Sequence, residues 1–192
     1  LLLGGTGFIG SAVLQRLIGA GHTVTATARD AKAARGRWPD VRWVARDIGA
    51  MTRGRDWGPL LNGVDAVINC AGALQDSTRD DVAAVQSAAP RALFATASAC
   101  GIERIVQVSA VGADAEAPTL FLRSKGEADA ALAKLPGDWV ILRPGLVLGP
   151  QAYGGSALLR ALAAMPFVLP VVRGTGPMQT VHVEEVAQAV LD

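Results

Sequence analysis

Cysteine, histidine and aromatic residues are scarce in this chain. Its 192 residues include two cysteines, two histidines and one tyrosine, and aromatic residues make up only 5% of the total. Cys70 and Cys100 cannot build a disulfide framework, and they lack the spacing of a metal site. We therefore expect a reducing compartment, the cytoplasm, as the location of the protein.

The chain also lacks an excess of charge of one sign and a long apolar run. Its formal net charge of +1 gives no reason to expect nucleic acid or an anionic membrane as a partner. The most apolar stretch, residues 161–172, is too short to span a bilayer and contains two prolines, so no transmembrane segment is expected. No signal peptide is visible either.

Short apolar runs alternate along the chain with longer segments of helical periodicity. This alternation is typical of βαβ units, and continuously apolar runs suit parallel strands that helices cover on both faces. Right-handed crossovers then predict a doubly wound α/β sheet with three α/β/α layers. No linker or repeat interrupts the pattern, so residues 1–192 are expected to form a single domain. The predicted strands are Leu1–Leu3, Thr23–Ala28, Val41–Ala45, Ala66–Cys70, Ile105–Ser109 and Val140–Arg143.

Three segments have the pattern of helices. Apolar residues recur on one side of Phe8–Ile18, and glycines at 19 and 21 end that helix. Val82–Ala99 is also helical in pattern, but we expect Pro90 to kink or divide it because proline has no N–H to donate. Lys125–Leu135 is rich in alanine and is expected to stop before Pro136.

A glycine-rich turn joins the first predicted strand to the first predicted helix. Gly4, Gly7 and Gly10 have the spacing G-x-x-G-x-x-G. A tight strand-to-helix turn needs glycine, and a bare Cα lets a pyrophosphate approach the main chain. The helix N-terminus then offers N–H groups and a positive dipole end to that anion. In this context the turn predicts a dinucleotide-binding Rossmann domain, rather than a glycine-rich turn without a ligand.

The sequence GGTGFIG at 4–10 closely resembles the nucleotide loop of extended and atypical short-chain dehydrogenases/reductases. Other motifs of that family match in order over nearly the whole chain, and the ordered set is more specific than any one of them. They are Asp47-Ile48, Asn69-Cys70-Ala71-Gly72, Val108-Ser109-Ala110, Phe121-Leu122-Arg123-Ser124-Lys125 in place of Tyr-x-x-x-Lys, Arg143-Pro144-Gly145, and 181–187.

The end of the second predicted strand indicates which dinucleotide binds. An NAD-binding member of the family carries a carboxylate there, on the ribose diol. Here the position is Ala28, followed by Arg29, whose guanidinium can pair with the 2′-phosphate of NADP. We therefore expect NADP(H) in preference to NAD(H). The alternative is that Arg29 is a solvated loop residue beside Asp30, and the excess of basic residues between 29 and 56 suits either.

The resemblance also assigns residues to the rest of the dinucleotide. It implies that Asp47 accepts a hydrogen bond from the adenine amino group and that Ile48 packs on the ring. It places residues 70–72 along the middle of the cofactor, although Cys70 has the alternative role of a small buried side chain. No metal ion is expected. The expected cofactor-binding residues are Gly4, Thr6, Gly7, Phe8, Ile9, Gly10, Arg29, Asp47, Ile48, Cys70, Ala71, Gly72, Lys125 and Pro144.

The catalytic motif of the family is altered. In the family a tyrosine exchanges a proton with the substrate, a lysine four residues later binds the nicotinamide ribose, and a serine holds the substrate oxygen. Lys125 and Ser109 occupy two of these positions and are the expected catalytic residues. The tyrosine position is Phe121, which has no proton to give. Tyr153, the one tyrosine of the chain, either reaches the site or has a solvated or packing role.

Three functions fit this altered motif. The first is an oxidoreductase that transfers hydride and takes the proton from another group, from water or from the substrate. The second is NADP(H) binding without turnover, as in the regulators and the respiratory complex I accessory subunit found among members of the family. Non-redox chemistry such as epimerisation is less favoured, because it needs more acid–base groups.

Substrate selectivity is expected to lie in the segment 150–180, because doubly wound sheets bind ligands at the carboxyl ends of their strands. This apolar segment would roof a substrate pocket, dock a protein partner or lie on a membrane surface. His182, before the last helical pattern, is expected to have a structural hydrogen-bonding role. The expected partners are a dinucleotide and either an unknown small-molecule substrate or a protein.

Overall fold

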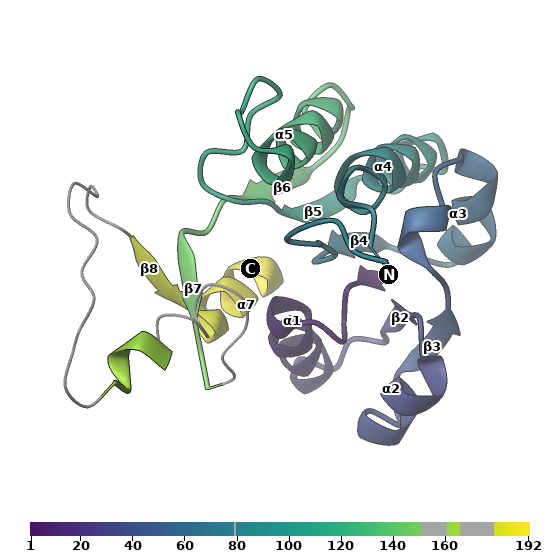
Figure 1. The fold of residues 1–192 in the computed structure, drawn as a ribbon. Helices are drawn as coiled ribbons and strands as arrows, with labels where there is room; N and C mark the ends of the chain where they lie inside the picture. Colours follow the sequence, from purple (N-terminus) through teal and green to yellow (C-terminus); the bar gives the residue numbers. More distant parts are fainter. Residues whose placement is uncertain (79, 151–160, 166–178) are drawn as a thin grey trace.

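The computed structural model describes residues 1–78, 80–150, 161–165 and 179–192. Within these residues, six parallel strands form the central sheet in the order β3-β2-β1-β4-β5-β6 (Figure 1). This is the strand order of a doubly wound Rossmann sheet, and it confirms the predicted fold class. The strands are β1 Leu2–Leu3, β2 Thr25–Ala28, β3 Arg42–Ala45, β4 Ala66–Asn69, β5 Arg104–Val108 and β6 Trp139–Leu142.

Helices cover both faces of this sheet (Figure 1). Helices α1 (Phe8–Gly19) and α7 (Val183–Leu191) pack against each other on one face, and α2 (Ala31–Arg37) follows β2 at its edge. Helices α3 (Gly54–Leu61), α4 (Ala89–Ala99) and α5 (Leu120–Leu132) cover the opposite face. Two further strands, β7 (Leu146–Leu148) and β8 (Thr180–His182), pair in parallel as a second small sheet.

Successive residues of the central strands belong to different cores. Leu2 packs with α1 and α7, while Leu3 packs with α3, α4 and α5, and both are fully buried. Ile68 and Val67 of β4 divide in the same way. Because side chains alternate across a strand, a sheet covered on both faces favours apolar residues on both sides of each strand. This explains why most of the predicted strands are largely apolar, although Thr27, Asn69 and Gln107 are buried polar residues within them.

Val82–Ala99 is helical throughout, which confirms the predicted helical pattern, but Pro90 does not divide it. Instead, a π-helical turn at Ala84–Ala88 lies directly before α4, and Pro90 is the second residue of α4. A proline lacks the N–H for a regular i→i−4 hydrogen bond, and the π-helical turn is the local departure from α-helical geometry beside it.

Helix α5 begins at Leu120, five residues earlier than the predicted start at Lys125. The cause is Thr119, whose side chain accepts a hydrogen bond from the Leu122 N–H at 3.3 Å and caps the helix. The prediction also missed α2, α3, β7 and β8. In the described part of the chain, no helix is long and apolar enough to cross a membrane.

Candidate functional site

The turn between β1 and α1 leaves no room for side chains at its glycines. Gly4 has a φ of +72°, and a Cβ there would lie 2.7 Å from the backbone of Cys70 and Ala71. A Cβ on Gly10 would collide with the carbonyl oxygen of Gly4. The Gly7 N–H donates to that same oxygen at 2.9 Å. The glycines therefore form a compact cradle whose surface is main chain.

Helix α1 begins at this cradle without a side-chain cap. Gly7 is the N-cap residue, and the first turn, which contains Phe8, Ile9 and Gly10, has no acidic side chain. The first N–H groups of the helix and the positive end of its dipole are therefore available to an anion. Glycine at 4 and 10 lets the loop pack closely on itself and on the backbone of Cys70 and Ala71, and the helix start above this loop suits the pyrophosphate of a dinucleotide.

A cavity of about 730 Å³ lies beside the cradle. It brings together Thr6 of the loop, Arg29 after β2 and Asp47 after β3, which are three of the predicted cofactor-binding residues. Arg37 and Trp38, which were not predicted, line the same cavity. The Arg37 guanidinium lies 4.4 Å from the centre of the Trp38 ring, a cation–π contact. The only sequence signal for Arg37 was its place in the basic stretch.

The two charged residues after β2 have different partners. Arg29 Nη1 donates to Asp80 Oδ1 at 2.9 Å, and both side chains are partly exposed. Asp30 instead caps α2, because its Oδ1 accepts the Ala33 N–H at 2.9 Å. The carboxylate next to Arg29 is thus committed to the helix that follows.

Asp47 and Ile48 stand at the end of β3. Asp47 Oδ1 accepts the Gly49 N–H at 3.1 Å and caps a short 3₁₀ turn at Ile48–Ala50. Asp47 lines the cavity, whereas Ile48 does not and packs instead toward the core under α3 and α4. The structure therefore brings Asp47, but not Ile48, to the cavity wall.

Residues 70–72 follow β4 immediately below the cradle. The Cys70 N–H donates to the Leu3 carbonyl oxygen at 3.0 Å, and the buried Ala71 N–H donates to Asn69 Oδ1, also at 3.0 Å. Burial raises the pKa of the Cys70 thiol to about 12, so the thiol is protonated at neutral pH. The half-buried Cys70 side chain packs against the core on the α1 side of the sheet.

Lys125 reaches from α5 to the backbone of Gly72. Its Nζ donates to the Val108 carbonyl oxygen at 3.1 Å, and a Cβ on Gly72 would lie 3.7 Å from Nζ. Burial lowers the pKa of Lys125 from 10.5 to about 8, and the charge of Asp129 acts in the opposite direction. The ammonium lies 5.7 Å from the centre of the Phe121 ring. Lys125 and Phe121 therefore share one end of the site.

Ser109 is bound to a carboxylate that the sequence did not single out. Its hydroxyl donates to Asp129 Oδ2 at 2.8 Å, and Arg143 Nε and Nη2 each lie 3.0 Å from the same oxygen. Asp129 is buried, and its pairing with a guanidinium offsets the cost of burying the charge. In the sequence, an aspartate one turn after Lys125 has the pattern of an exposed helix residue. Only the fold shows its partner, because Arg143 follows β6 and reaches Asp129 from there.

Gln86 lies in the π-helical turn and faces the same space as Lys125. Its Nε2 donates to Ser124 Oγ at 3.3 Å, while its buried Oε1 has no hydrogen-bond partner among the described residues. A Cβ on Gly72 would lie 3.3 Å from this oxygen. An acceptor in this position suits a donor on a bound ligand.

Some predicted residues lie elsewhere. Pro144 lines a separate cavity of about 570 Å³ between the end of β6 and helix α7. His182 caps α7, with its Nδ1 accepting the Glu184 N–H at 3.3 Å, which confirms its structural role. Tyr153 and most of the segment 150–180 lie outside the described residues. The part of the chain that the structure describes holds no cluster of side chains able to bind a metal ion.

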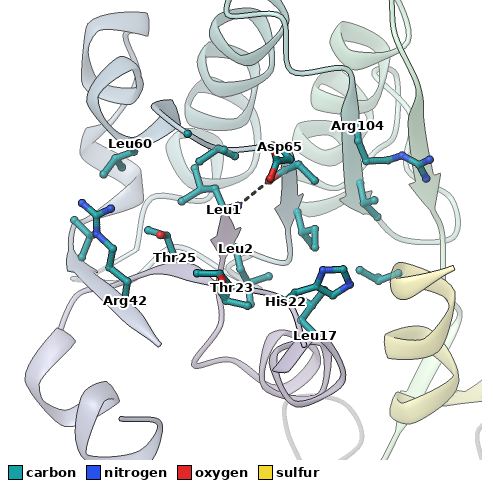
Figure 2. A pocket seen from close by; sticks show the side chains of 18 of the residues that line it. Leu1, Leu2, Leu17, His22, Thr23, Thr25, Arg42, Leu60, Asp65 and Arg104 are labelled. Atoms are coloured by element: carbon teal, nitrogen blue, oxygen red, sulfur yellow. Dashed lines mark hydrogen bonds between the residues drawn. The ribbon is translucent and has the colours of Figure 1, made fainter. Parts of the chain in front are cut away.

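Another cavity, of about 610 Å³, opens at the amino ends of the strands. Leu1, Leu17 and His22 are among the residues that line it (Figure 2). The backbone nitrogen of Leu1 donates to the Ala66 carbonyl oxygen at 2.7 Å. None of the predicted cofactor-binding residues lines it. Because doubly wound sheets bind nucleotides at the carboxyl ends of their strands, this cavity is not the nucleotide site.

Proteins of known activity resemble this chain in sequence. It is 30% identical to an NAD(P)H azoreductase of Xenophilus azovorans over 148 residues, which cover 77% of this chain and 48% of the azoreductase. It is 27% identical to a ceramide reductase of Caulobacter vibrioides over 97% of this chain and 57% of the reductase. The chain thus spans about half the length of these curated relatives.

Solved structures share the fold. A UDP-glucose 4-epimerase of Thermus thermophilus in complex with NAD has a TM-score of 0.74 at 22% identity, covering 98% of this chain and 71% of the epimerase. A yeast methylglyoxal/isovaleraldehyde reductase complexed with NADPH has a TM-score of 0.76 at 17% identity, covering 99% of this chain and 72% of the reductase.

The sequence model of a family described as NAD(P)H-binding matches residues 4–191, from the glycine cradle to the last helix. The cradle, the cavity beside it and the strand order agree with that match. The chain therefore belongs to this NAD(P)H-binding family and has a Rossmann fold.

Proposed function

We propose that the protein is an NADP(H)-dependent reductase whose proton donor differs from that of its family. The observation that carries the nucleotide preference is Arg29 on the wall of the cavity beside the glycine cradle. A guanidinium pairs well with a 2′-phosphate, and a second one, Arg37, lines the same cavity. Asp30 lines the cavity too, but its Oδ1 accepts the Ala33 N–H and caps α2, which leaves only Oδ2 for a ribose diol.

Other residues of the site would contact the other parts of the dinucleotide. The glycine cradle and the first turn of α1 would hold the pyrophosphate, and Asp47 would bind the adenine. Lys125 lies near Gly72 together with Gln86 Oε1, which has no hydrogen-bond partner among the described residues, and both would bind hydroxyls of the nicotinamide ribose. A bound nicotinamide dinucleotide supplies hydride to an acceptor. The similarity to an azoreductase and a ceramide reductase supports a reductase.

A sensor or regulator that binds NADP(H) without turnover is the second candidate. Phe121 favours it, since the position that carries the proton donor in the family has no exchangeable hydrogen here. NADPH oxidation in the presence of an acceptor separates the two functions. A reductase oxidises NADPH in proportion to the acceptor, whereas a sensor binds NADPH and leaves it reduced with every acceptor tried.

The nucleotide preference is tested by isothermal titration with NADPH and NADH. Wild type should bind NADPH at least about 10-fold more tightly, because each charge-assisted pair to the 2′-phosphate adds roughly 1.5–3 kcal/mol. Arg29→Ala should lose that preference. Arg35→Ala is the matched control, because Arg35 lies on α2 without lining the cavity. Equal affinities of wild type for both nucleotides would contradict the proposal.

The organisation and location of the protein are also part of this proposal. Residues 1–192 form one domain, with the segment 150–180 facing the substrate or a protein partner. A cytoplasmic location suits Cys70 and Cys100, which are unpaired thiols. Thiol titration in denaturant of the protein purified without reductant checks this assignment and should find both cysteines reduced.

A further inference from the structure

Phe121 presents an apolar ring where the family places its proton donor. It lies on α5 four residues before Lys125, and its half-buried ring faces the ammonium at 5.7 Å. A phenyl ring has no hydrogen that a substrate oxygen can accept. A substrate held against Phe121 therefore receives packing from this side chain and no proton.

The hydroxyl hydrogen of Ser109 is directed away from a substrate. A carboxylate paired with a guanidinium accepts hydrogen bonds and donates none, so in the 2.8 Å contact the hydrogen belongs to Ser109 and points to Asp129 Oδ2. Ser109 Oγ is thus left to accept a hydrogen bond from a ligand rather than to donate one. Ser109, like Phe121, therefore has no hydrogen to donate to the substrate oxygen.

Lys125 is held by the backbone. Its Nζ donates to the Val108 carbonyl oxygen, and the residue is only 7% exposed. Its ammonium faces Gly72, on the cofactor side of the site. These contacts suit a group that holds the nicotinamide ribose, and a proton-donating role for Lys125 is one of the outcomes tested below.

Compounds that accept hydride differ in how strongly their reduction depends on a side chain that donates a proton. Reduction of an aldehyde or ketone produces an alkoxide, whose conjugate acid is about as weak as water with a pKa of roughly 16, so a proton must arrive with the hydride. Reduction of a quinone produces a phenolate-like monoanion, whose conjugate acid resembles tyrosine with a pKa of about 10. That anion forms in water without an acid beside it.

The loops around this end of the site carry exposed apolar side chains. Leu74 follows β4 and is 64% exposed, Val111 follows β5 and is 56% exposed, and Leu120 begins α5 and is 37% exposed. All three lie at the carboxyl ends of neighbouring strands, where a doubly wound sheet binds ligands. Such side chains suit a flat apolar ring better than a polar sugar.

We propose that this site reduces planar quinones in preference to aldehydes and ketones, with water as the source of the proton. The inference rests on the proposed reductase function and names its substrate class. The quinone accepts two electrons and one hydrogen as hydride from NADPH, so a nicotinamide C–H bond breaks as an O–H bond forms on the quinone. The resulting hydroquinone monoanion takes one proton from water, and the products are hydroquinone, NADP⁺ and hydroxide, which the buffer neutralises.

Two acceptors with the same two-ring skeleton test the preference. NADPH oxidation by the full chain is followed with menadione, a quinone, and with naphthaldehyde. We expect kcat/KM for menadione to exceed that for naphthaldehyde by about 100-fold or more, the usual worth of a missing general acid. Comparable rates with both acceptors would overturn the inference and leave the proposed reductase function intact. Oxidation with neither acceptor would overturn both.

A hydroxyl introduced at position 121 sharpens the test. Phe121→Tyr should raise the ratio of the naphthaldehyde rate to the menadione rate by at least about 30-fold, because it restores a general acid. Phe121→Leu is the matched control, since it changes the shape of the side chain without adding a hydroxyl and should leave the ratio low. If Phe121→Leu raises the ratio as much as Phe121→Tyr, shape decides the preference and the inference is wrong.

Binding without turnover provides an independent readout. In the presence of NADP⁺, which carries no hydride to transfer, menadione should bind to wild type, and Phe121→Ala should weaken it about 10-fold by isothermal titration. Binding that does not depend on the side chain at 121 would contradict the placement of the quinone. Naphthaldehyde reduction that falls as the pH rises through about 8 would show Lys125 as the donor and overturn the inference.

Discussion

The two ends of the proposed site differ in how many of the functional groups expected from the family they contain. At the proposed adenosine end, a glycine cradle and a cavity with two arginines suit a phosphorylated dinucleotide. At the proposed nicotinamide end, Lys125 is buried on α5, but Phe121 has no hydroxyl and Ser109 gives its hydrogen to Asp129. The two sets of residues lie on separate loops of the sheet, so we propose that nucleotide binding is kept in this chain while proton transfer is altered.

The largest predicted effect comes from adding one methyl group to the glycine cradle at the adenosine end. In Gly10→Ala the new Cβ collides with the Gly4 carbonyl oxygen, so the cradle must open. NADPH affinity should fall on the order of 100-fold, and the free energy of unfolding should drop by about 1–3 kcal/mol. Titration calorimetry and urea unfolding measure the two effects.

Gly19→Ala is the matched control for this change. Gly19 ends α1, and a Cβ there meets nothing within 4 Å. Its NADPH affinity should equal that of wild type, and helix propensity should make it as stable or slightly more stable. Equal losses in the two variants would mean that the cradle has no special role, and the contrast between the two ends would fail.

Lys125, at the nicotinamide end, should make the free energy of unfolding depend on pH. The folded-state pKa of Lys125 is about 8 against an ordinary value of 10.5, so the unfolded chain binds more protons between these values. Stability should therefore rise with pH across this window, by up to about 3 kcal/mol at 1.36 kcal/mol per pKa unit. Urea unfolding at pH 7 and pH 10 measures the change.

Lys125→Met removes the titrating group and keeps the length of the side chain. The difference in unfolding free energy between variant and wild type should shrink as the pH rises from 8 to 10.5, because the buried charge of wild type is lost there. A difference that stays constant over this range would show that Lys125 is not held charged in an apolar environment.

The smallest predicted effect concerns the partner of Arg29. Asp80 forms an exposed ion pair with Arg29, so a 2′-phosphate competes with this carboxylate for the guanidinium. Asp80→Asn should therefore raise NADPH affinity about 3-fold at low salt, with a smaller gain at high salt. NADH affinity is the internal control and should not change. A loss of NADPH affinity would mean that Asp80 orients Arg29 rather than competes for it.

Much of the fold was predictable because its signals are local. Most of the central strands are short, largely apolar runs, and the glycine cradle has the strand before it and the helix after it that its chemistry requires. Helix α3 was missed because it contains Gly54, Gly58 and Pro59, which resemble a loop. What holds it is the complete burial of Trp57, a tertiary effect that no local pattern shows.

The site was predictable only where one motif carries it. The cradle and Lys125 were predicted from contiguous motifs, and Arg29 from its place at the end of a strand; the structure places Arg29 on the cavity wall. Arg37 lines the cavity because α2 lies beside β2 in the fold. Asp129 of α5 pairs with Arg143 because β6, which ends just before Arg143, is the strand that follows α5 in the chain. Contacts of this kind join residues from different elements, and spacing along the chain does not encode them.

A single-turnover experiment tests the contrast between the two ends most directly. The protein is loaded with NADPH and mixed rapidly with menadione or naphthaldehyde while the nicotinamide absorbance is followed. The structure predicts that the bound NADPH is oxidised rapidly by menadione and remains reduced, though tightly bound, with naphthaldehyde. Equally fast oxidation by both acceptors would show that the nicotinamide end possesses a proton donor, and it would contradict this account.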